Sequence, residues 1–171
     1  MPGNQKPMNH LEIERKFLVD RDQWSLLVKP AGTRYLQGYL SIDDDKVVRV
    51  RAAGEKGFLT IKGKSDTFSH SEFEYEIPAT EAAELIRQFA TSRVEKVRIK
   101  IPKGKYVWEV DEFHGDNEGL LMAEIELENP EDVFEKPTWL GQEVTGDKRY
   151  YNAYLSLHPF RTWHEKTPDP F

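Results

Sequence analysis

The chain has 171 residues, of which 38% are hydrophobic and 12% aromatic, so it can form one domain with a packed core. Its 24 basic and 30 acidic residues give a net charge of -6 without any basic run, which argues against a nucleic-acid-binding surface. The absence of cysteine excludes disulfides and thiol catalysis, and the absence of a long apolar run excludes a transmembrane helix, so we expect a cytoplasmic protein.

The first predicted element is a strand over residues 10–19, in which charged and apolar side chains alternate with a period of two. Glu12, Glu14 and Lys16 share one face, opposite apolar residues such as Ile13. An ordinary half-buried strand presents a mixture of polar side chains to solvent. Here two carboxylates and an ammonium group follow one another at spacings of about 6.5–7 Å.

Seven more alternating strands are predicted along the chain, at residues 33–42, 46–52, 58–62, 70–77, 93–102, 105–113 and 120–128. Helices are predicted at residues 20–29, 80–90 and 130–135, and a last helix begins near residue 145 or 147. The expected N-caps of the first three helices are Asp20 or Asp22, Thr80 and Asn129. The short connections favour a mainly antiparallel sheet with helices packed on it.

The charged strand faces are sorted by sign from one strand to the next. The acids on these faces are Glu12, Glu14, Glu74, Glu76, Glu109, Asp111, Glu124 and Glu126. The bases are Lys16, Arg49, Arg51, Lys62, Lys96, Arg98 and Lys148. For any single strand, a solvent-exposed charged face is the simpler interpretation. The sorting and near balance of the whole set instead predict a closed barrel with a polar interior and helices covering its apolar outer face.

The chemistry of these side chains indicates a ligand. Carboxylates clustered without histidine or cysteine favour hard cations such as Mg²⁺ or Mn²⁺. Arginine and lysine opposite them favour a polyanion, and arginine suits fixed bidentate contacts with phosphate. The sequence has no glycine-rich phosphate loop and no recognisable nucleophile arrangement. The two sets together indicate a metal-bound polyphosphate.

Residues 12–16 (Glu-Ile-Glu-Arg-Lys) resemble the Glu-x-Glu-x-Lys signature of the CYTH domain, within the triphosphate tunnel metalloenzymes. The resemblance continues through residues 37–40, 48–51, 60–62, 74–76, 94–98, 109–111, 123–126 and 144–150. It covers a domain at residues 10–158, which leaves 1–9 as a flexible leader and 159–171 as a tail. It implies an eight-stranded antiparallel tunnel that depends on divalent metal and acts on triphosphates. The chain is most similar to the short bacterial members that hydrolyse inorganic tripolyphosphate.

The resemblance and the side-chain chemistry together assign expected roles. The metal ligands are Glu12, Glu14, Asp111, Glu124 and Glu126. The substrate-binding bases are Lys16, Arg49, Arg51, Lys62, Lys96, Arg98 and Lys148, supported by Glu74, Glu76 and Glu109. The catalytic residues are Lys16, Glu14 and Tyr39, although a tyrosine packed in the core is an alternative for Tyr39. Glu72, Lys100 and Glu128 lie at strand ends and are left out of the site.

The expected reaction is direct attack of water on a terminal phosphoryl group, with one or two Mg²⁺ or Mn²⁺ ions as cofactors. The alternatives are an adenylate cyclase, a thiamine-triphosphatase, or a binding module without activity. No aromatic or Asn/Gln cluster on the charged faces is expected to recognise adenine, which favours an inorganic triphosphate as substrate. We expect no nucleic-acid or membrane partner, and we allow for a homodimer.

Overall fold

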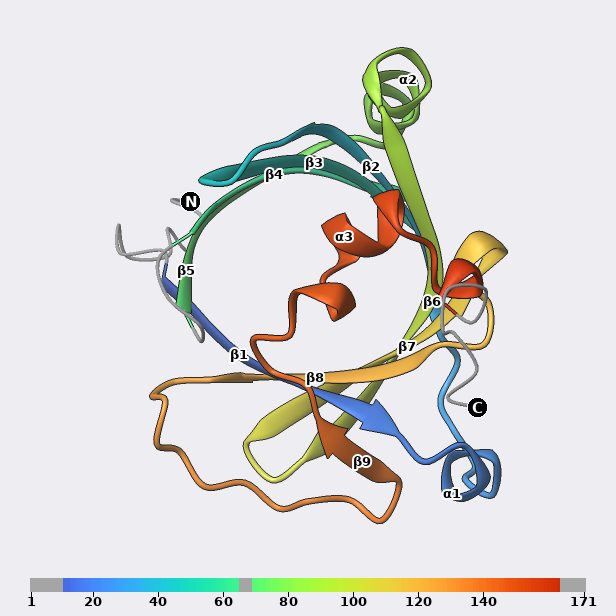
Figure 1. The fold of residues 1–171 in the computed structure, drawn as a ribbon, viewed down its shortest axis with the longest axis vertical. Coiled ribbons are helices and arrows are strands. Elements are labelled where there is room, and N and C mark those ends of the chain that lie inside the picture. The colour runs from blue at the N-terminus through green and yellow to red at the C-terminus, as the bar shows by residue number, and fades with distance from the viewer. Residues whose placement is uncertain (1–10, 65–68, 164–171) are drawn as a thin grey trace, which may run out of the picture.

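The computed structural model describes residues 11–64 and 69–163, which form a single antiparallel sheet with helices around it (Figure 1). The strands are β1 (Leu11–Val19), β2 (Thr33–Ile42), β3 (Lys46–Ala53), β4 (Lys56–Lys64), β5 (Ser69–Pro78), β6 (Ser92–Lys103), β7 (Tyr106–His114), β8 (Leu121–Leu127) and β9 (Leu140–Glu143). They follow the order β5-β4-β3-β2-β6-β7-β8-β1-β9, and β1 also pairs with β5. This last pairing brings the two sides of the sheet together, so β1–β8 encircle an interior that we call the lumen (Figure 1).

The predicted barrel of eight antiparallel strands is confirmed, because every predicted strand is present and alternates as expected. In β6, Lys96 and Arg98 lie on the face toward the lumen, while Val97 and Ile99 pack in the apolar cluster on the outer face. β9 was not predicted. It has four residues, of which three are exposed, and it carries no alternation that a sequence pattern could reveal.

The helices differ more from the predictions. They are α1 (Arg21–Ser25), α2 (Ala79–Phe89) and α3 (Asn152–Leu157), with short 3-10 turns η1 (Gly115–Asn117), η2 (Lys148–Tyr150) and η3 (Phe160–Thr162). α1 is shorter than predicted, although Asp20 caps it by accepting a hydrogen bond from the backbone of Gln23. Within the described ranges, no helix has the length and apolar character needed to cross a membrane.

Three helix predictions were wrong in detail. The segment 130–135 forms no helix, because residues 130 and 131 lie in a turn and residues 132–135 have no regular secondary structure. The Asp132 carboxylate closes this turn by accepting hydrogen bonds from the backbone N–H groups of Glu128 and Asn129. Thr80 does not cap α2, whose N-cap position is Pro78. The last helix starts later than predicted, because extended backbone at Tyr151 separates η2 from α3.

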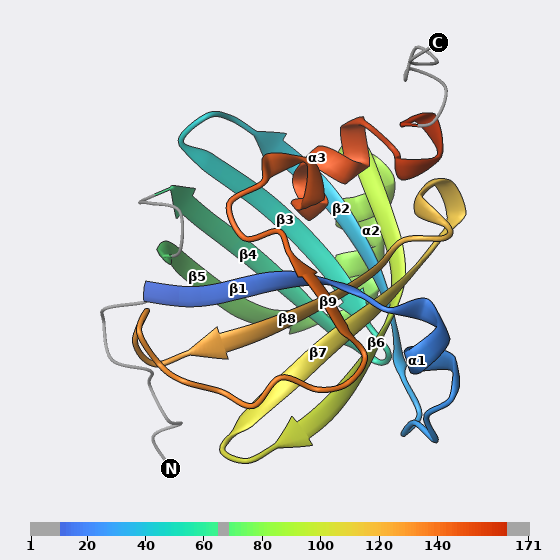
Figure 2. The ribbon, with the colours of Figure 1, turned by 60° about the horizontal axis from the view of Figure 1, so that its bottom comes forward.

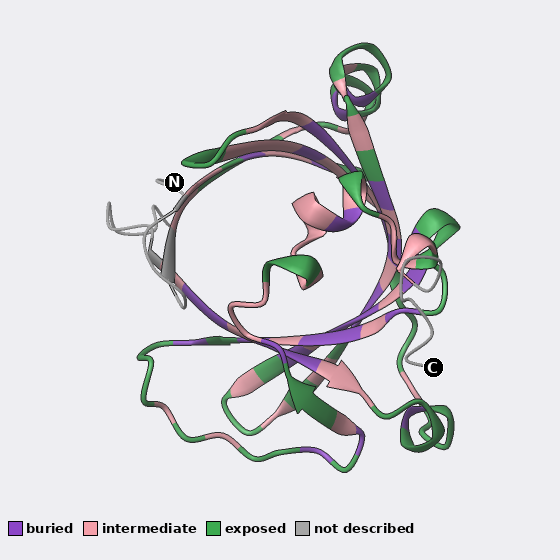
Figure 3. Ribbon diagram, viewed as in Figure 1, coloured by how far each residue is buried: buried purple, intermediate pink, exposed green. Residues whose placement is uncertain are grey.

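Two apolar layers cover the outside of the barrel. α2 packs on the outer face of β2–β5, where Val50, Ala82 and Ile86 are fully buried. On the opposite side, Trp24 of α1 and Trp139 pack with Trp108 against the outer face of β1 and β6–β8. The strands of the ring are mostly buried or intermediate, whereas the chain between β8 and β9 is largely exposed (Figure 3). These layers confirm the predicted covering of the outer face.

α3 is the exception to the prediction that helices pack outside. Seen down the barrel axis it lies within the outline of the ring, and from the side it lies at one end (Figures 1 and 2). Leu155 of α3 is fully buried and packs in one cluster with the inward-facing Tyr39, Val94 and Met122. α3 therefore closes one end of the lumen with apolar contacts.

We expect Leu155→Ala to lower the free energy of unfolding by about 2–5 kcal/mol, because it leaves a cavity where α3 meets the barrel. Chemical denaturation followed by tryptophan fluorescence measures this loss. The control is Leu157→Ala at the end of α3, where the side chain is 51% exposed and the expected change is within about 0.5 kcal/mol. Equal effects of the two substitutions would show that α3 is not docked through Leu155.

Candidate active site

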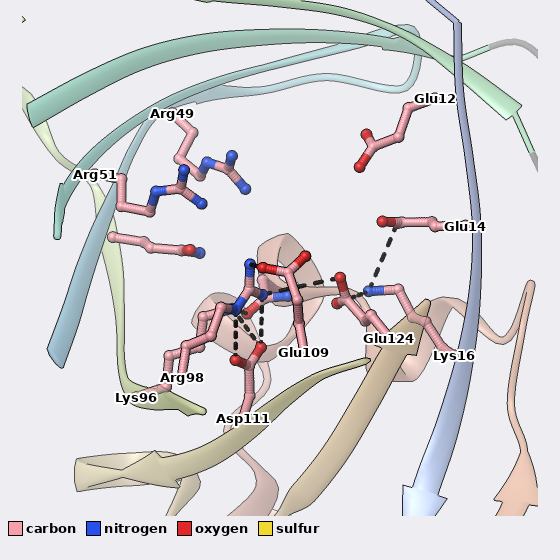
Figure 4. A network of polar contacts seen from close by, with 12 residues as sticks. Glu12, Glu14, Lys16, Arg49, Arg51, Lys96, Arg98, Glu109, Asp111 and Glu124 are labelled. Atoms are coloured by element: carbon pink, nitrogen blue, oxygen red, sulfur yellow. Dashed lines mark hydrogen bonds and ion pairs between the residues drawn. The ribbon is translucent and has the colours of Figure 1, made fainter. Parts of the chain in front are cut away.

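The lumen gathers the charged side chains of seven strands. Glu12, Glu14 and Lys16 of β1 lie across the interior from Arg49 and Arg51 of β3 (Figure 4). The same close view shows Lys96, Arg98, Glu109, Asp111 and Glu124 converging from β6, β7 and β8. Lys62 of β4 and Glu74 of β5 join them through ion pairs. The charged faces that alternate along the sequence therefore line one enclosed polar site.

Asp111 is the most fully paired acid in the lumen. Its Oδ1 accepts from Nε of Arg98 at 2.8 Å, and its Oδ2 accepts from Nη2 of Arg98 at 2.9 Å and from Nζ of Lys96 at 2.7 Å. Glu109 accepts a further hydrogen bond from Nη1 of Arg98 at 3.0 Å. Burial opposes ionisation of Asp111, but the two bases outweigh it and lower the pKa of its carboxyl group. Burial lowers the pKa of Lys96 to about 7.

Lys16 and Lys62 lie among the glutamates of β1, β5 and β8. Lys16 is 5% exposed, and its Nζ donates to Oε1 of Glu124 at 2.7 Å. Nζ of Lys62 lies 3.1 Å from Oε2 of Glu12 and 4.0 Å from Oε1 of Glu14, so it forms an ion pair with each of them. Burial raises the pKa of Glu12 and Glu14, and the positive charge of Lys62 only partly opposes this effect. The β1 carboxylates are therefore short of positive charge.

The two arginines of β3, in contrast, have too few hydrogen-bond acceptors. Nη2 of Arg51 donates to Glu74 at 3.2 Å, and Nη2 of Arg49 donates to Thr60 at 3.4 Å. Both arginines leave a buried Nε without a hydrogen-bond acceptor among the described residues. Buried donors are nearly always satisfied in folded proteins, so these groups indicate a site for an anionic acceptor.

An aromatic pair flanks Arg51 on the lumen side of β2 and β4. The guanidinium carbon lies 4.9 Å from the ring centre of Tyr35 and 5.2 Å from that of Phe58. Tyr35 also contacts Arg98 at 5.1 Å. The rings are already engaged by guanidinium groups, which fixes the arginines in place.

Tyr39 lies on the inner face of β2 and is 2% exposed. Its hydroxyl oxygen accepts a hydrogen bond from Nε2 of Gln37 at 3.2 Å, and Gln37 is fully buried. Burial raises the pKa of Tyr39, so its hydroxyl group keeps its proton at neutral pH. Tyr39 packs in one cluster with Leu155 of α3, as the alternative of a core tyrosine expects, and its catalytic role stays a prediction.

Three predicted site residues lie at the margin of this arrangement. Lys148 is exposed on η2, and within the described residues its ammonium group makes no hydrogen bond or ion pair. Glu126 is exposed and lies opposite Glu14 in the pairing of β1 with β8. Glu76 is exposed near the end of β5. Glu74 is exposed as well, and the other predicted residues are buried or half-buried in the lumen.

The structure adds residues that the sequence reasoning missed. Gln37 and Thr60 lie on the charged strand faces, so the same alternation could have identified them. Glu72 was left out as a strand-end residue, but one of its carboxylate oxygens lies 3.7 Å from Nζ of Lys62. Asn152 of α3 accepts a hydrogen bond from Lys96, and no sequence pattern pointed to it.

The carboxylates of the lumen are chemically suited to bind a hard divalent cation. Glu12, Glu14 and Glu124 are oxygen ligands inside the lumen, and the negative charges of Glu124 and Glu12 raise the pKa of Glu14. Among the described residues, Oε2 of Glu12 accepts no hydrogen bond, although it forms an ion pair with Lys62. Across the described ranges, no three His, Cys, Asp or Glu side chains already converge as ligands of one ion. The lysines occupy part of this space, with Lys16 on Glu124 and Lys62 beside Glu12.

Comparison with known proteins gives consistent matches over most of the chain. The sequence model of the CYTH domain matches residues 10–151. An inorganic triphosphatase of Acetivibrio thermocellus is 49% identical over 155 residues, which are 90% of this chain and 98% of that protein. One from Nitrosomonas europaea is 37% identical over 155 residues, 85% of this chain and 97% of that protein. A crystal structure of an inorganic triphosphatase superposes with a TM-score of 0.61 at 34% identity, covering 85% of this chain and 94% of that one.

We expect Glu14→Gln to stabilise the metal-free protein at neutral pH. Burial raises the pKa of Glu14 above its ordinary value of 4.5, so the folded chain holds a proton that the unfolded chain has lost. The wild type therefore loses stability as pH rises from 4.5 through the raised pKa, and the glutamine variant does not. Above that range the difference between the two proteins stays constant.

Melting temperatures in excess EDTA between pH 4.5 and 8 measure this difference. Glu118→Gln, at an exposed position, controls for the loss of one carboxylate. A gap between Glu14→Gln and the wild type that is the same at both ends of the pH range would contradict the assignment of a costly buried carboxylate.

Proposed function

Because the chain belongs to the CYTH domain family, we propose that it is an enzyme that hydrolyses inorganic tripolyphosphate to pyrophosphate and phosphate. The observation that carries the proposal is the lumen itself, where buried carboxylates lie short of positive charge and buried guanidinium groups lie short of acceptors. A polyphosphate bound with a divalent cation satisfies both sets. The two relatives named as inorganic triphosphatases, matched over nearly their whole length, support the same reaction.

The bases of the lumen bind the phosphate chain in this proposal. Arg49, Arg51 and Arg98 present planar guanidinium groups that can contact two phosphate oxygens each. Lys16, Lys62 and Lys96 add positive charge from β1, β4 and β6. Asp111 already accepts from Arg98 and Lys96 through both oxygens, so we propose that it anchors these bases instead of ligating metal. Lys148, exposed on η2, is proposed as a weaker contact.

The β1 and β8 carboxylates are the proposed holders of Mg²⁺ or Mn²⁺, with Glu12, Glu14 and Glu124 as the buried donors and Glu126 at the margin. When bound, such an ion neutralises phosphate oxygens and makes a bound water more acidic. The lysines that now lie on these carboxylates are then free to contact phosphate. Glu74 and Glu109 support the site by orienting Arg51 and Arg98.

The proposed reaction is direct attack of water on a terminal phosphorus atom. A P–O bond forms to the water oxygen, the bridging P–O bond breaks, and pyrophosphate leaves. Glu14, on the inner face of β1, is the proposed acceptor of the proton that the water loses. Lys16 offsets the negative charge that develops on the phosphoryl oxygens, and Tyr39 can donate its hydroxyl proton to the same group. No covalent intermediate is required.

The cytoplasm as the site of action, the absence of nucleic-acid and membrane partners, and a homodimer are parts of the same proposal. Inorganic tripolyphosphate is preferred to a nucleotide because the lumen is closed at one end by α3. The aromatic rings of Tyr35 and Phe58 are engaged by Arg51, which leaves no obvious stacking partner for a base among the described residues of the lumen.

We expect hydrolysis of tripolyphosphate to require Mg²⁺ or Mn²⁺ and to stop in excess EDTA. Glu14→Gln should lose at least about 100-fold in rate, the usual effect of removing an acid–base group, while keeping its fold. Phosphate release measured with and without each ion tests this, with Glu118→Gln as the matched control at an exposed position. Undiminished turnover in EDTA would refute the role of the metal.

We also expect tripolyphosphate to be cleaved much faster than ATP, with ADP and phosphate as the only products from ATP. Hydrolysis needs a triphosphate and a placed water, whereas cyclisation also needs the ribose 3′-hydroxyl oriented at the α-phosphorus. Chromatography of the products after incubation with each substrate decides the question. Cyclic AMP and pyrophosphate formed at a rate comparable to tripolyphosphate cleavage would replace the hydrolase with a cyclase.

A further inference from the structure

The first residues of α3 reach two buried lysines of the lumen. Oδ1 of Asn152 accepts a hydrogen bond from Nζ of Lys96 at 3.0 Å. The ring of Tyr151, one residue earlier, lies 5.6 Å from Nζ of Lys16. The segment that closes one end of the barrel therefore also contacts the charged groups proposed to bind phosphate.

The ammonium group of Lys96 is almost completely fixed by its surroundings. The side chain is 1% exposed, lies against the ring of Phe113 at 5.6 Å, and donates to Oδ2 of Asp111 at 2.7 Å. An ammonium group has three N–H donors, and Asp111 and Asn152 take two of them from β7 and α3. Arg98, on the same face of β6, holds Asp111 from the other side. One N–H of Lys96 is left to contact a ligand.

We propose that Asn152 is a positioning residue of the triphosphate site, which holds the Lys96 ammonium group so that its third N–H is directed at a phosphate oxygen. This inference rests on the proposed function. Two anchors on different elements fix the direction of the third donor, whereas Asp111 alone leaves the group free to turn about a single hydrogen bond. A hydrogen bond from a charged donor is among the stronger ones, so its direction affects binding.

The remaining contacts of α3 show that Asn152 is not needed to dock the helix. Leu155 is fully buried against the inner face of the barrel, and Ser156 Oγ lies 2.8 Å from Ser92 Oγ of β6. The match to the CYTH domain ends at residue 151, so Asn152 lies just beyond it. Substitution of Asn152 can therefore separate the orientation of Lys96 from the attachment of α3.

The test compares tripolyphosphate binding by calorimetry, in excess EDTA so that the ligand is not consumed. Asn152→Leu removes the acceptor at similar volume and should weaken binding about tenfold or more. Asn152→Asp keeps an acceptor oxygen and should bind more tightly than Asn152→Leu. Ser156→Ala removes a second polar contact of α3 with the barrel, the one with Ser92, and should bind like the wild type. If Ser156→Ala weakens binding as much as Asn152→Leu, the effect comes from docking and the inference is wrong.

A double-mutant cycle with Lys96→Met identifies the partner through which Asn152 acts. In the Lys96→Met background, Asn152→Leu should cause no further loss of binding. The same loss in both backgrounds would overturn the inference and leave the proposed function standing. A wild-type protein that binds no tripolyphosphate, with or without Mg²⁺, would overturn the proposed function as well, so the two failures are distinguishable. Melting temperatures of all variants verify that each is folded.

Discussion

The pairing of opposite charges inside a closed sheet is the interaction on which the structure depends. Asp111 accepts from Arg98 and Lys96 in a place where all three side chains are less than one-tenth exposed. A buried charge without a partner is strongly destabilising, because its loss of hydration is not offset. The barrel can enclose so many ionised groups only because acids and bases from neighbouring strands meet at hydrogen-bond distance. The apolar layers outside, built on Trp108 and Ile86, supply the hydrophobic stabilisation that the lumen lacks.

The pairing is complete on one side of the lumen and incomplete on the other. Both carboxylate oxygens of Asp111 accept hydrogen bonds, so Asp111 and its two bases form a rigid support on this side of the lumen. On β1, burial raises the pKa of Glu12 and Glu14, and on β3 the Nε atoms of Arg49 and Arg51 have no acceptor in the part of the chain that the structure describes. The free protein therefore keeps two unsatisfied sets of opposite sign close together. A cation with a polyphosphate relieves both, which connects the stability of the fold to the proposed reaction.

The lumen was predictable because one period of two runs through eight strands, so that Arg49 and Arg51 fall on the same side as Glu12 and Glu14. Features that depend on how the elements dock, or on a turn that interrupts a helix pattern, could not be predicted. The segment 130–135 follows Asn129 and Pro130, which are typical of a helix start, but it forms a turn and then irregular chain. Glu72 enters the site through the register of β4 with β5, which places it directly opposite Lys62. Asn152 meets Lys96 through the placement of α3, which no strand period records.

A crystal structure of the protein with tripolyphosphate and Mn²⁺, at a pH where turnover is slow, tests the central claim most directly. The account predicts phosphate density inside the barrel, in contact with Arg49, Arg51 and Arg98. It also predicts an anomalous manganese peak beside Glu12 and Glu14. Tripolyphosphate bound on the outer surface, or manganese bound away from the β1 carboxylates, would contradict the claim that the incompletely satisfied charged groups of the lumen form the catalytic site.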